Sequence, residues 1–464
     1  MKSNIKILFI IFFALFISQS CSSKKDKDHN NEDHFVKGKV IEKIICKKDT
    51  SQNYSLYLPS YYNSDKQWPV IYAFDSHARG NIPVKLLKDM AEKYGYIIVG
   101  SNNSKNGLSW EYLNNSIDIL FDDTYQNFSI DKKRIYCTGF SGGARVATSI
   151  AIFKGGITGV IGCSAGFPKI DRPITNKFNY IGLVGDKDFN YLEMQNLNKA
   201  LDKSDIKHQL IIFEGKHDWP PKKIIPDVFL WLEFNAMRNN LIPVNDSAIH
   251  NFIKNNLPET DKKNNPHETY KTYILYKKII NYLDDLYDVT EYKKILTKLE
   301  QSDKIQKKIK YKEQNEQKEV ELQQQYLYYL SAKNVLWWKK EVERLNEQIK
   351  NTKDKEETLL IKRLLNFLSL SSYMQSYNTI NSNDFKQAEK SLKLYKIIDP
   401  ENYGPSYLYA CLYSKQNKLD KAISELNNAI ELGFDDFNDL KQEPMLKLLR
   451  DTKKYNEIIK PRIN

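Results

Sequence analysis

The chain has 464 residues, 41% hydrophobic content and a formal net charge of +12, which allows two or three domains with substantial cores. The charge does not indicate a nucleic-acid binder, because the most charged stretch, residues 301–360, interleaves 13 Lys and Arg with 11 Asp and Glu and carries no basic-aromatic motif. The five cysteines include no CxxC pair, so the sequence predicts no metal site.

The first 20 residues are predicted to be a signal peptide. Lys2 and Lys6 precede ILFIIFFALFI, an apolar run of 11 residues that is too short to span a bilayer. SQSC follows, and a cysteine after small residues resembles the cleavage box of bacterial lipoproteins. The resemblance implies that Cys21 is lipidated and that the protein is anchored to the outer membrane of the cell envelope, on the periplasmic side or at the surface. Simple cleavage to a soluble secreted protein is the alternative.

Residues 21–35 are polar and charged and are predicted to be a flexible tether. Residues 36–240 follow as a predicted α/β domain. Strands are expected at 39–46, 53–59, 69–75, 96–101, 134–140, 158–166, 178–186 and 207–215, and helices at 84–94, 110–127, 142–153 and 226–237. Apolar strands that alternate with helices predict a mostly parallel sheet covered on both faces. In such sheets the ligand site lies at the carboxyl ends of the strands.

Residues 245–464 are predicted to be an all-α domain, because glycine nearly vanishes and the apolar periodicity becomes helical. Near the C-terminus Ala388 and Ala422 occupy equivalent positions of two similar segments, an offset of 34 residues (422 − 388). This period resembles the tetratricopeptide repeat, although Tyr395 stands where that repeat has a small residue. The resemblance implies a stacked helical array whose concave face binds a partner or a substrate.

The motif GFSGG at 139–143 is the strongest chemical signal of the chain. It closes a predicted strand and opens a predicted helix, which is the setting of a nucleophile elbow. Small flanking residues allow the tight turn that exposes the hydroxyl of Ser141. The same turn directs the first helical amides, including that of Gly142, toward a developing oxyanion.

A serine hydroxyl needs a general base to become a useful nucleophile. The domain contains His77, His208 and His217. His208 begins a predicted strand and is interpreted as structural. His217 follows the end of that strand and precedes the last helix, so His217 is the predicted base.

The acid that orients this base should follow the strand at 178–186. GDKD at 185–188 offers two aspartates, and the spacing after the glycine favours Asp188, whose carboxylate would hold the imidazole tautomer. Asp186 and Asp218 remain the alternative acids. The resulting chain order is Ser141, Asp188, His217.

The loop after the strand at 69–75 should supply the second oxyanion donor. The amide of Ser76 is the predicted donor, with that of His77 next. His77 and Arg79 are candidates for lining the substrate cleft, with loop structure and surface charge as the alternative roles.

Taken together, GFSGG, GDKD and GKHDW in this order resemble the α/β-hydrolase superfamily, in particular its dienelactone-hydrolase, poly(3-hydroxybutyrate)-depolymerase and feruloyl-esterase-like branches. The resemblance covers residues 36–240. It implies a Ser-His-Asp triad that needs no cofactor and acts on an ester-bearing small molecule or glycan, with peptides as an alternative substrate. Fold alone does not settle function.

Three hypotheses follow. The first is a membrane-anchored serine hydrolase of esterase type. The second is a non-catalytic envelope scaffold whose helical repeats bind a protein partner. The third combines them, with the array docking the enzyme onto a partner or polymer, so that truncation after about residue 240 would retain activity on small esters.

Overall fold

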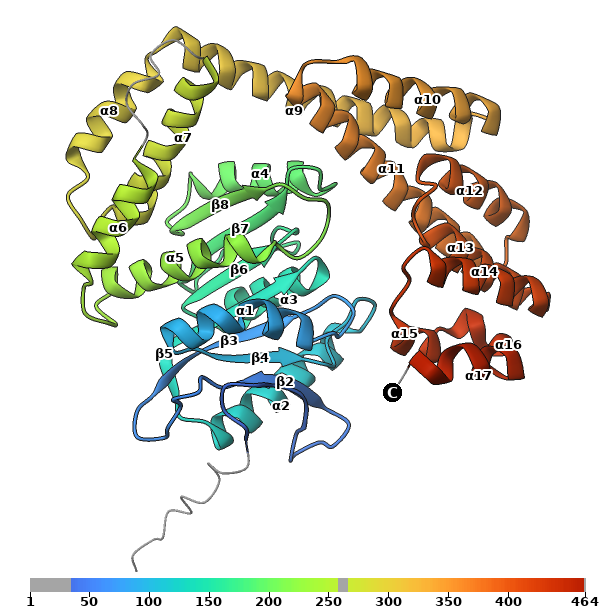
Figure 1. Cartoon of the computed structure of the whole chain (residues 1–464), viewed down its shortest axis with the longest axis horizontal. Coiled ribbons are helices and arrows are strands. Elements are labelled where there is room, and N and C mark those ends of the chain that lie inside the picture. Colours follow the sequence, from blue (N-terminus) through green and yellow to red (C-terminus); the bar gives the residue numbers. More distant parts are fainter. Residues whose placement is uncertain (1–34, 258–265, 463–464) are drawn as a thin grey trace, which may run out of the picture. The chain divides into compact units, whose positions relative to one another are not determined.

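Eight strands form a single sheet in the first half of the computed structural model (Figure 1). They are β1 (Val40–Ile45), β2 (Asn53–Tyr57), β3 (Trp68–Phe74), β4 (Ile97–Ser101), β5 (Ile130–Phe140), β6 (Gly159–Cys163), β7 (Asn179–Gly185) and β8 (His208–Phe213). The order across the sheet is β1-β2-β4-β3-β5-β6-β7-β8, and β2 alone runs antiparallel to its neighbours. The predicted α/β class with a mostly parallel sheet is therefore confirmed.

The structure describes residues 35–257 and 266–462. The predicted signal peptide, the predicted lipidation site Cys21 and the tether up to residue 34 lie outside the described residues. Among the helices that are described, none combines the length and the apolar character needed to cross a membrane.

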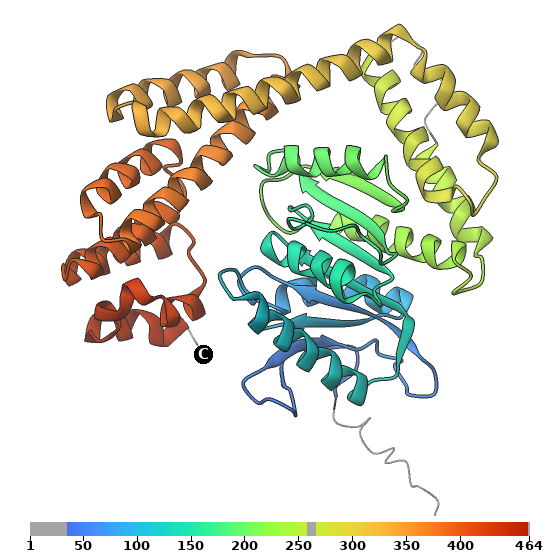
Figure 2. The ribbon, with the colours of Figure 1, turned by 180° about the vertical axis from the view of Figure 1, so that it is seen from behind.

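Side-chain alternation along the strands explains why both faces of the sheet are covered. In β3, Ile71 belongs to the core under helices α1 (Asn81–Tyr94) and α5 (Ile225–Arg238), whereas the next residue, Tyr72, stacks at 4.1 Å on Phe121 of α2 (Trp110–Asn127). In β7, Leu183 faces α5 and Val184 packs with α4 (Tyr191–Leu201). Figure 2, the view from behind, brings α2 to the front.

Two helical details differ from the predicted ones. Helix α4 was not predicted, because asparagines such as Asn196 and Asn198 weaken the helical signal of its sequence. Helix α3 (Gly142–Ser149) continues into a π-helical turn at Ile150–Lys154. The predicted helix over 142–153 therefore ends in a wider turn than an α-helix would give.

The sheet domain shares its core with the next two helices, α6 (Asp246–Asn256) and α7 (Pro266–Leu283). Phe234 of α5 meets Phe252 of α6 edge-on at 5.5 Å, and Phe252 stacks at 4.8 Å on Tyr282 of α7. Arg238 donates hydrogen bonds to the carbonyl oxygens of Tyr282 and Asp284. Helix α5 therefore lies between the sheet and the α6–α7 pair, while the domain boundary near 240–245 stays a prediction.

The rest of the described chain is helical, as predicted. Its α-helices are α8 (Thr290–Glu300), α9 (Asp303–Ala332), α10 (Val335–Asn351), α11 (Lys355–Asn381), α12 (Phe385–Ile398), α13 (Gly404–Lys415), α14 (Leu419–Glu431), α15 (Phe437–Gln442), α16 (Lys447–Arg450) and α17 (Lys453–Ile459). Ala388 and Ala422, the two residues of the 34-residue offset, are both fully buried in one apolar cluster. The tetratricopeptide assignment itself stays a prediction. From Lys37 onward the chain forms one compact unit.

Candidate active site

Ser141 lies in a strained turn between β5 and α3. Its backbone has φ 54° and ψ −120°, a conformation that is costly for a residue with a side chain. The turn is tight on both sides: a Cβ atom at Gly139 would lie 2.1 Å from the Gly143 carbonyl oxygen, and one at Gly143 would lie 2.0 Å from the Phe74 carbonyl oxygen. The two glycines therefore allow the turn, and the serine projects from it at the carboxyl end of β5.

The structure brings Ser141, His217 and Asp188 into one hydrogen-bonded chain. His217 Nε2 lies 3.0 Å from Ser141 Oγ, and His217 Nδ1 lies 2.9 Å from Asp188 Oδ1. The Asp188 side chain is fully buried, and 17% of the His217 side chain is exposed. A proton on Nδ1, held by the carboxylate, leaves Nε2 free to accept the serine proton.

Neighbouring groups fix the imidazole and the carboxylate. The ring of Phe189 stacks on His217 at 4.0 Å, and Phe140 packs against the same imidazole at 4.8 Å. The backbone amide of Asn190 donates to Asp188 Oδ1 over 2.8 Å. These contacts restrict the rotamers of both side chains before a substrate binds.

The alternative acids Asp186 and Asp218, and the histidine of β8, His208, form hydrogen bonds with groups other than the His217 imidazole. Asp186 Oδ1 accepts from the Gly215 amide at 3.1 Å, and Asp218 Oδ1 accepts from the Trp219 amide at 2.7 Å. His208 pairs with Asp202 through Nε2 at 3.1 Å. The imidazole of His217 is therefore joined to Asp188, and the other groups have local structural roles.

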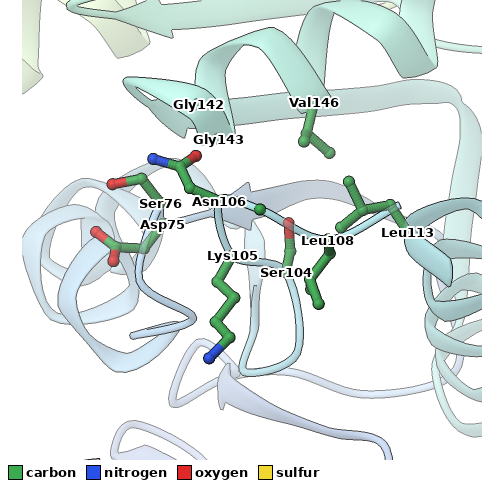
Figure 3. A pocket seen from close by; sticks show the side chains of 11 residues that line it. Asp75, Ser76, Ser104, Lys105, Asn106, Leu108, Leu113, Gly142, Gly143 and Val146 are labelled. Atoms are coloured by element: carbon green, nitrogen blue, oxygen red, sulfur yellow. The ribbon is translucent and has the colours of Figure 1, made fainter. Parts of the chain in front are cut away.

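The two predicted oxyanion donors lie next to the serine turn. Within the described residues, the amides of Gly142 and Ser76 donate no hydrogen bond to the protein, and Ser76 is buried. Figure 3 shows the Asn106 side chain extending toward both residues. Asn106 Oδ1 is so close that a Cβ atom at Gly142 would lie 1.8 Å from it. Asn106 belongs to GSNNSKNG (100–107), a turn at a predicted strand end for which the sequence favours a backbone role, with facing the site as the alternative.

Asp75, which the sequence did not single out, joins two loops of the site, the one after β3 and the one after β8. The buried carboxylate accepts hydrogen bonds from the His77 amide (2.9 Å), Arg79 Nε (3.0 Å) and Trp219 Nε1 (2.8 Å). Burial acts to raise the pKa of Asp75, but the hydrogen bond and charge of Arg79, with the other two donors, hold this pKa below its ordinary value. Its position directly after an apolar strand was the available signal.

The structure thus places His77 and Arg79 on the loop that carries the Ser76 amide. The His77 imidazole lies 3.1 Å from Ser76 Oγ through Nδ1. Arg79 donates its hydrogen bonds mainly to Asp75, and about a third of its side chain is exposed. Both residues therefore contact groups of their own loop, and their role toward a substrate stays a prediction.

A cavity of about 140 Å³ opens beside the oxyanion donors (Figure 3). Leu108, Leu113 and Val146 form its apolar wall, and Ser76 and Ser104 contribute polar atoms. Drug-sized ligands occupy roughly 300–1,000 Å³, so this cavity accepts a much smaller group. Among the described residues, no cluster of three or more His, Cys, Asp or Glu is placed to hold a metal ion.

The strand order, the strained serine turn and the Ser-Asp-His order along the chain are those of an α/β-hydrolase fold. No family model matches the chain. A 55-residue segment is 36% identical to a chloroplastic protein of Arabidopsis thaliana, and the match covers 12% of this chain and 16% of that protein.

Several solved structures resemble the sheet domain. S-formylglutathione hydrolase of Staphylococcus aureus is 15% identical, with 39% of this chain and 90% of that chain covered at a TM-score of 0.34. A ferulic acid esterase is 18% identical, with 43% and 98% covered at a TM-score of 0.35. An acylaminoacyl peptidase of Pyrococcus horikoshii is 15% identical, with 39% of each chain covered at a TM-score of 0.31.

Proposed function

We propose that the protein is a serine hydrolase that cleaves carboxylic esters through an acyl-enzyme intermediate. The observation that carries the proposal is the hydrogen-bonded chain of Ser141, His217 and Asp188 beside two backbone amides that donate to no other group of the described protein. Nucleophile, base, orienting acid and oxyanion donors are the complete set of groups that acyl transfer requires.

In this proposal each of these groups has one role. Ser141 Oγ attacks the ester carbonyl while His217 Nε2 takes the hydroxyl proton. The negative charge that develops on the carbonyl oxygen is stabilised by the amides of Gly142 and Ser76. His217 then gives the proton to the leaving alcohol, and water attacks the acyl-enzyme with the same imidazole as base. Asp188 stabilises the imidazolium in both halves of the reaction, and no cofactor takes part.

Activated serines react with fluorophosphonates, and this reaction tests the proposal directly. We expect a fluorescent fluorophosphonate to label the wild-type protein and to leave Ser141→Ala unlabelled, with hydrolysis of short-chain esters lost in the same variant. Circular dichroism of both proteins controls for folding. Equal absence of labelling in two well-folded proteins would refute the proposal and favour the scaffold hypothesis.

The cavity beside the oxyanion donors points to a short acyl group. Its apolar wall suits a short alkyl chain, and its volume of about 140 Å³ leaves no room for a long one. The alcohol part of the ester would then lie on the open side, where a glycan or another small molecule can be accommodated.

The size preference of this cavity can be tested with p-nitrophenyl esters of increasing acyl length. We expect kcat/KM to be highest for the shortest acyl chains and to fall roughly 10- to 200-fold once a chain exceeds the cavity. Leu113→Ala removes part of the apolar wall and should move the optimum to longer chains. An unchanged chain-length profile in a folded Leu113→Ala protein would place the acyl group elsewhere.

Attachment to the outer membrane through a lipidated Cys21 is part of the same proposal, as is docking of a partner or polymer by the helical array. Two observations bring the C-terminal end of the helical region close to the loops of the proposed site, so a partner bound at that end would lie near Ser141. Gln442 of α15 accepts a hydrogen bond from Lys105 over 2.9 Å. Burial acts to lower the pKa of Arg79, but Asp75 raises it, and the charges of Asp436 and Asp435 of the array add to that rise.

A further inference from the structure

The turn that follows β7 carries Asp188, which contacts the His217 imidazole. Backbone hydrogen bonds attach one side of this turn to the sheet domain. The amide of Asp186 donates to the Phe213 carbonyl over 2.8 Å, and the amide of Lys187 donates to the Gly215 carbonyl over 2.9 Å. These bonds fix the turn to the end of β8. The carbonyl oxygens of Asp186 and Lys187 take no part in these bonds.

Those two carbonyl oxygens are bound by helix α11 of the array. Arg363 Nη1 donates to the Asp186 carbonyl over 3.0 Å, and Asn366 Nδ2 donates to the Lys187 carbonyl over 2.6 Å. The donors are three residues apart, so they lie on the same face of the helix. Helix α11 therefore holds the two consecutive peptide groups immediately before Asp188. Arg363 is 177 residues from Asp186 in sequence, and Asn366 is 179 residues from Lys187.

Arg363 is itself rigidly held. Glu319 of α9 accepts from Arg363 Nε at 2.9 and 3.0 Å and from Nη2 at 2.6 Å, and both side chains are buried. The guanidinium also lies 4.2 Å from the ring centroid of Tyr191. Tyr191 is the first residue of α4, and its amide donates to the Asp188 carbonyl over 3.1 Å. The array therefore contacts the chain on both sides of Asp188.

Stability alone does not account for a buried ion pair at this point. Replacement of such a pair by apolar side chains of similar volume is often neutral or stabilising. A guanidinium held by a carboxylate offers something that an apolar contact lacks, namely a donor fixed in direction toward one carbonyl oxygen. The fixed direction of this donor matters because its acceptor is the carbonyl of Asp186, two residues before Asp188.

We infer that Arg363 and Asn366 are positioning residues of the active site, through which the helical array holds the Asp188 turn in the geometry that the imidazole needs. The inference rests on the proposed serine-hydrolase function. In this inference the helical array contributes directly to the rate of turnover, in addition to any role in binding a partner or polymer. Displacement of a catalytic group by about 1 Å can cost roughly 100-fold in rate, so a loosened turn should be visible in kcat.

The experiment uses the full chain and a soluble short-chain ester. The double variant Arg363→Met/Glu319→Met removes the donor without leaving a buried charge unpaired. We expect kcat to fall about 10- to 100-fold while KM changes less than about threefold, since no residue of α11 lines the cavity beside Ser76 and Gly142. Asn366→Leu removes only the hydrogen bond to the Lys187 carbonyl, at a half-buried site. This variant should show a smaller fall in kcat, again with little change in KM.

A matched control is available on the same side of the array. Lys199 of α4 pairs with Glu316 of α9 at 2.6 Å, a contact between array and sheet domain that does not touch the Asp188 turn. Lys199→Met should leave kcat unchanged. Chemical unfolding of every variant shows whether a fall in kcat accompanies a loss of the native state.

Combination with Asp188→Asn separates positioning from general destabilisation. If α11 acts through Asp188, the Arg363→Met/Glu319→Met change should lower kcat in the wild-type background and have no further effect on the residual rate of Asp188→Asn. Equal falls in both backgrounds, or an unchanged kcat in a folded double variant, would overturn the inference while the hydrolase function stands. A wild-type protein without turnover or fluorophosphonate labelling would overturn both.

Discussion

Asp188→Asn is expected to lower kcat by about 10⁴-fold while leaving the fold intact. Asp188 Oδ1 lies 2.9 Å from His217 Nδ1 and also accepts from the Asn190 amide. Asparagine carries no negative charge to stabilise the imidazolium that forms when His217 takes the proton of Ser141. Steady-state hydrolysis of a short-chain ester, with circular dichroism as the check on folding, measures the effect.

Asp186→Asn and Asp218→Asn are the matched controls for this change. Both residues are close to Asp188 or His217 in sequence, yet their carboxylates accept hydrogen bonds from backbone amides instead of the imidazole. An asparagine side-chain oxygen can accept the same bonds, so kcat should stay within a few-fold of wild type. A large loss in either control, with an active Asp188→Asn protein, would assign the acid differently.

Arg134→Met is expected to cost about 3–5 kcal/mol of unfolding free energy, because it leaves a buried carboxylate without its cation. Arg134 Nη2 donates to Glu233 Oε1 over 2.6 Å and to Tyr96 Oη over 2.9 Å, and all three residues are buried under the sheet. Urea unfolding measures the loss. Adding Glu233→Leu should recover most of it, since an apolar pair replaces the ion pair; a single variant that loses less than about 1 kcal/mol would contradict the prediction.

The cost of Arg134→Met should depend on pH with a definite sign. Burial raises the pKa of Glu233 above its ordinary value of 4.5, although Arg134 and Tyr96 act to lower it. Without Arg134 the folded-state pKa rises further. A carboxyl with a raised folded pKa contributes stability that is fully present below the unfolded pKa and is lost as pH rises through the folded pKa. The variant should therefore be closest to wild type below about pH 4.5 and fall behind as the pH rises through the folded-state pKa of Glu233.

Much of the fold could be predicted from local sequence patterns. The predicted strand at 69–75 corresponds to β3, and the run before the serine motif corresponds to the end of β5, whose first residues were missed. Continuous apolar runs identify buried strands because both faces of a parallel sheet are covered. The spacing in GFSGG and GDKD also placed Ser141 and Asp188 at strand ends, which the topology then brings to the same edge of the sheet.

Groups whose contacts join distant parts of the chain gave no signal specific enough to predict those contacts. Asp75 and Trp219 are 144 residues apart, and Arg363 is 177 residues from the carbonyl that it binds. A single aspartate after a strand, or an arginine within an amphipathic helix, looks like many others until the fold fixes its neighbours. The same reason explains why the packing of α6 and α7 into the sheet domain could not be inferred from their helical periodicity.

The position of α5 has a consequence for biosynthesis. A nascent chain that has just reached Arg238 already contains all eight strands and all three triad residues, yet the outer face of its last helix, with Phe234, has no cover. That cover arrives only with Phe252 and Tyr282. A chain that ends near residue 240 would therefore expose this apolar face, so native packing of the sheet domain requires residues that follow it in the sequence.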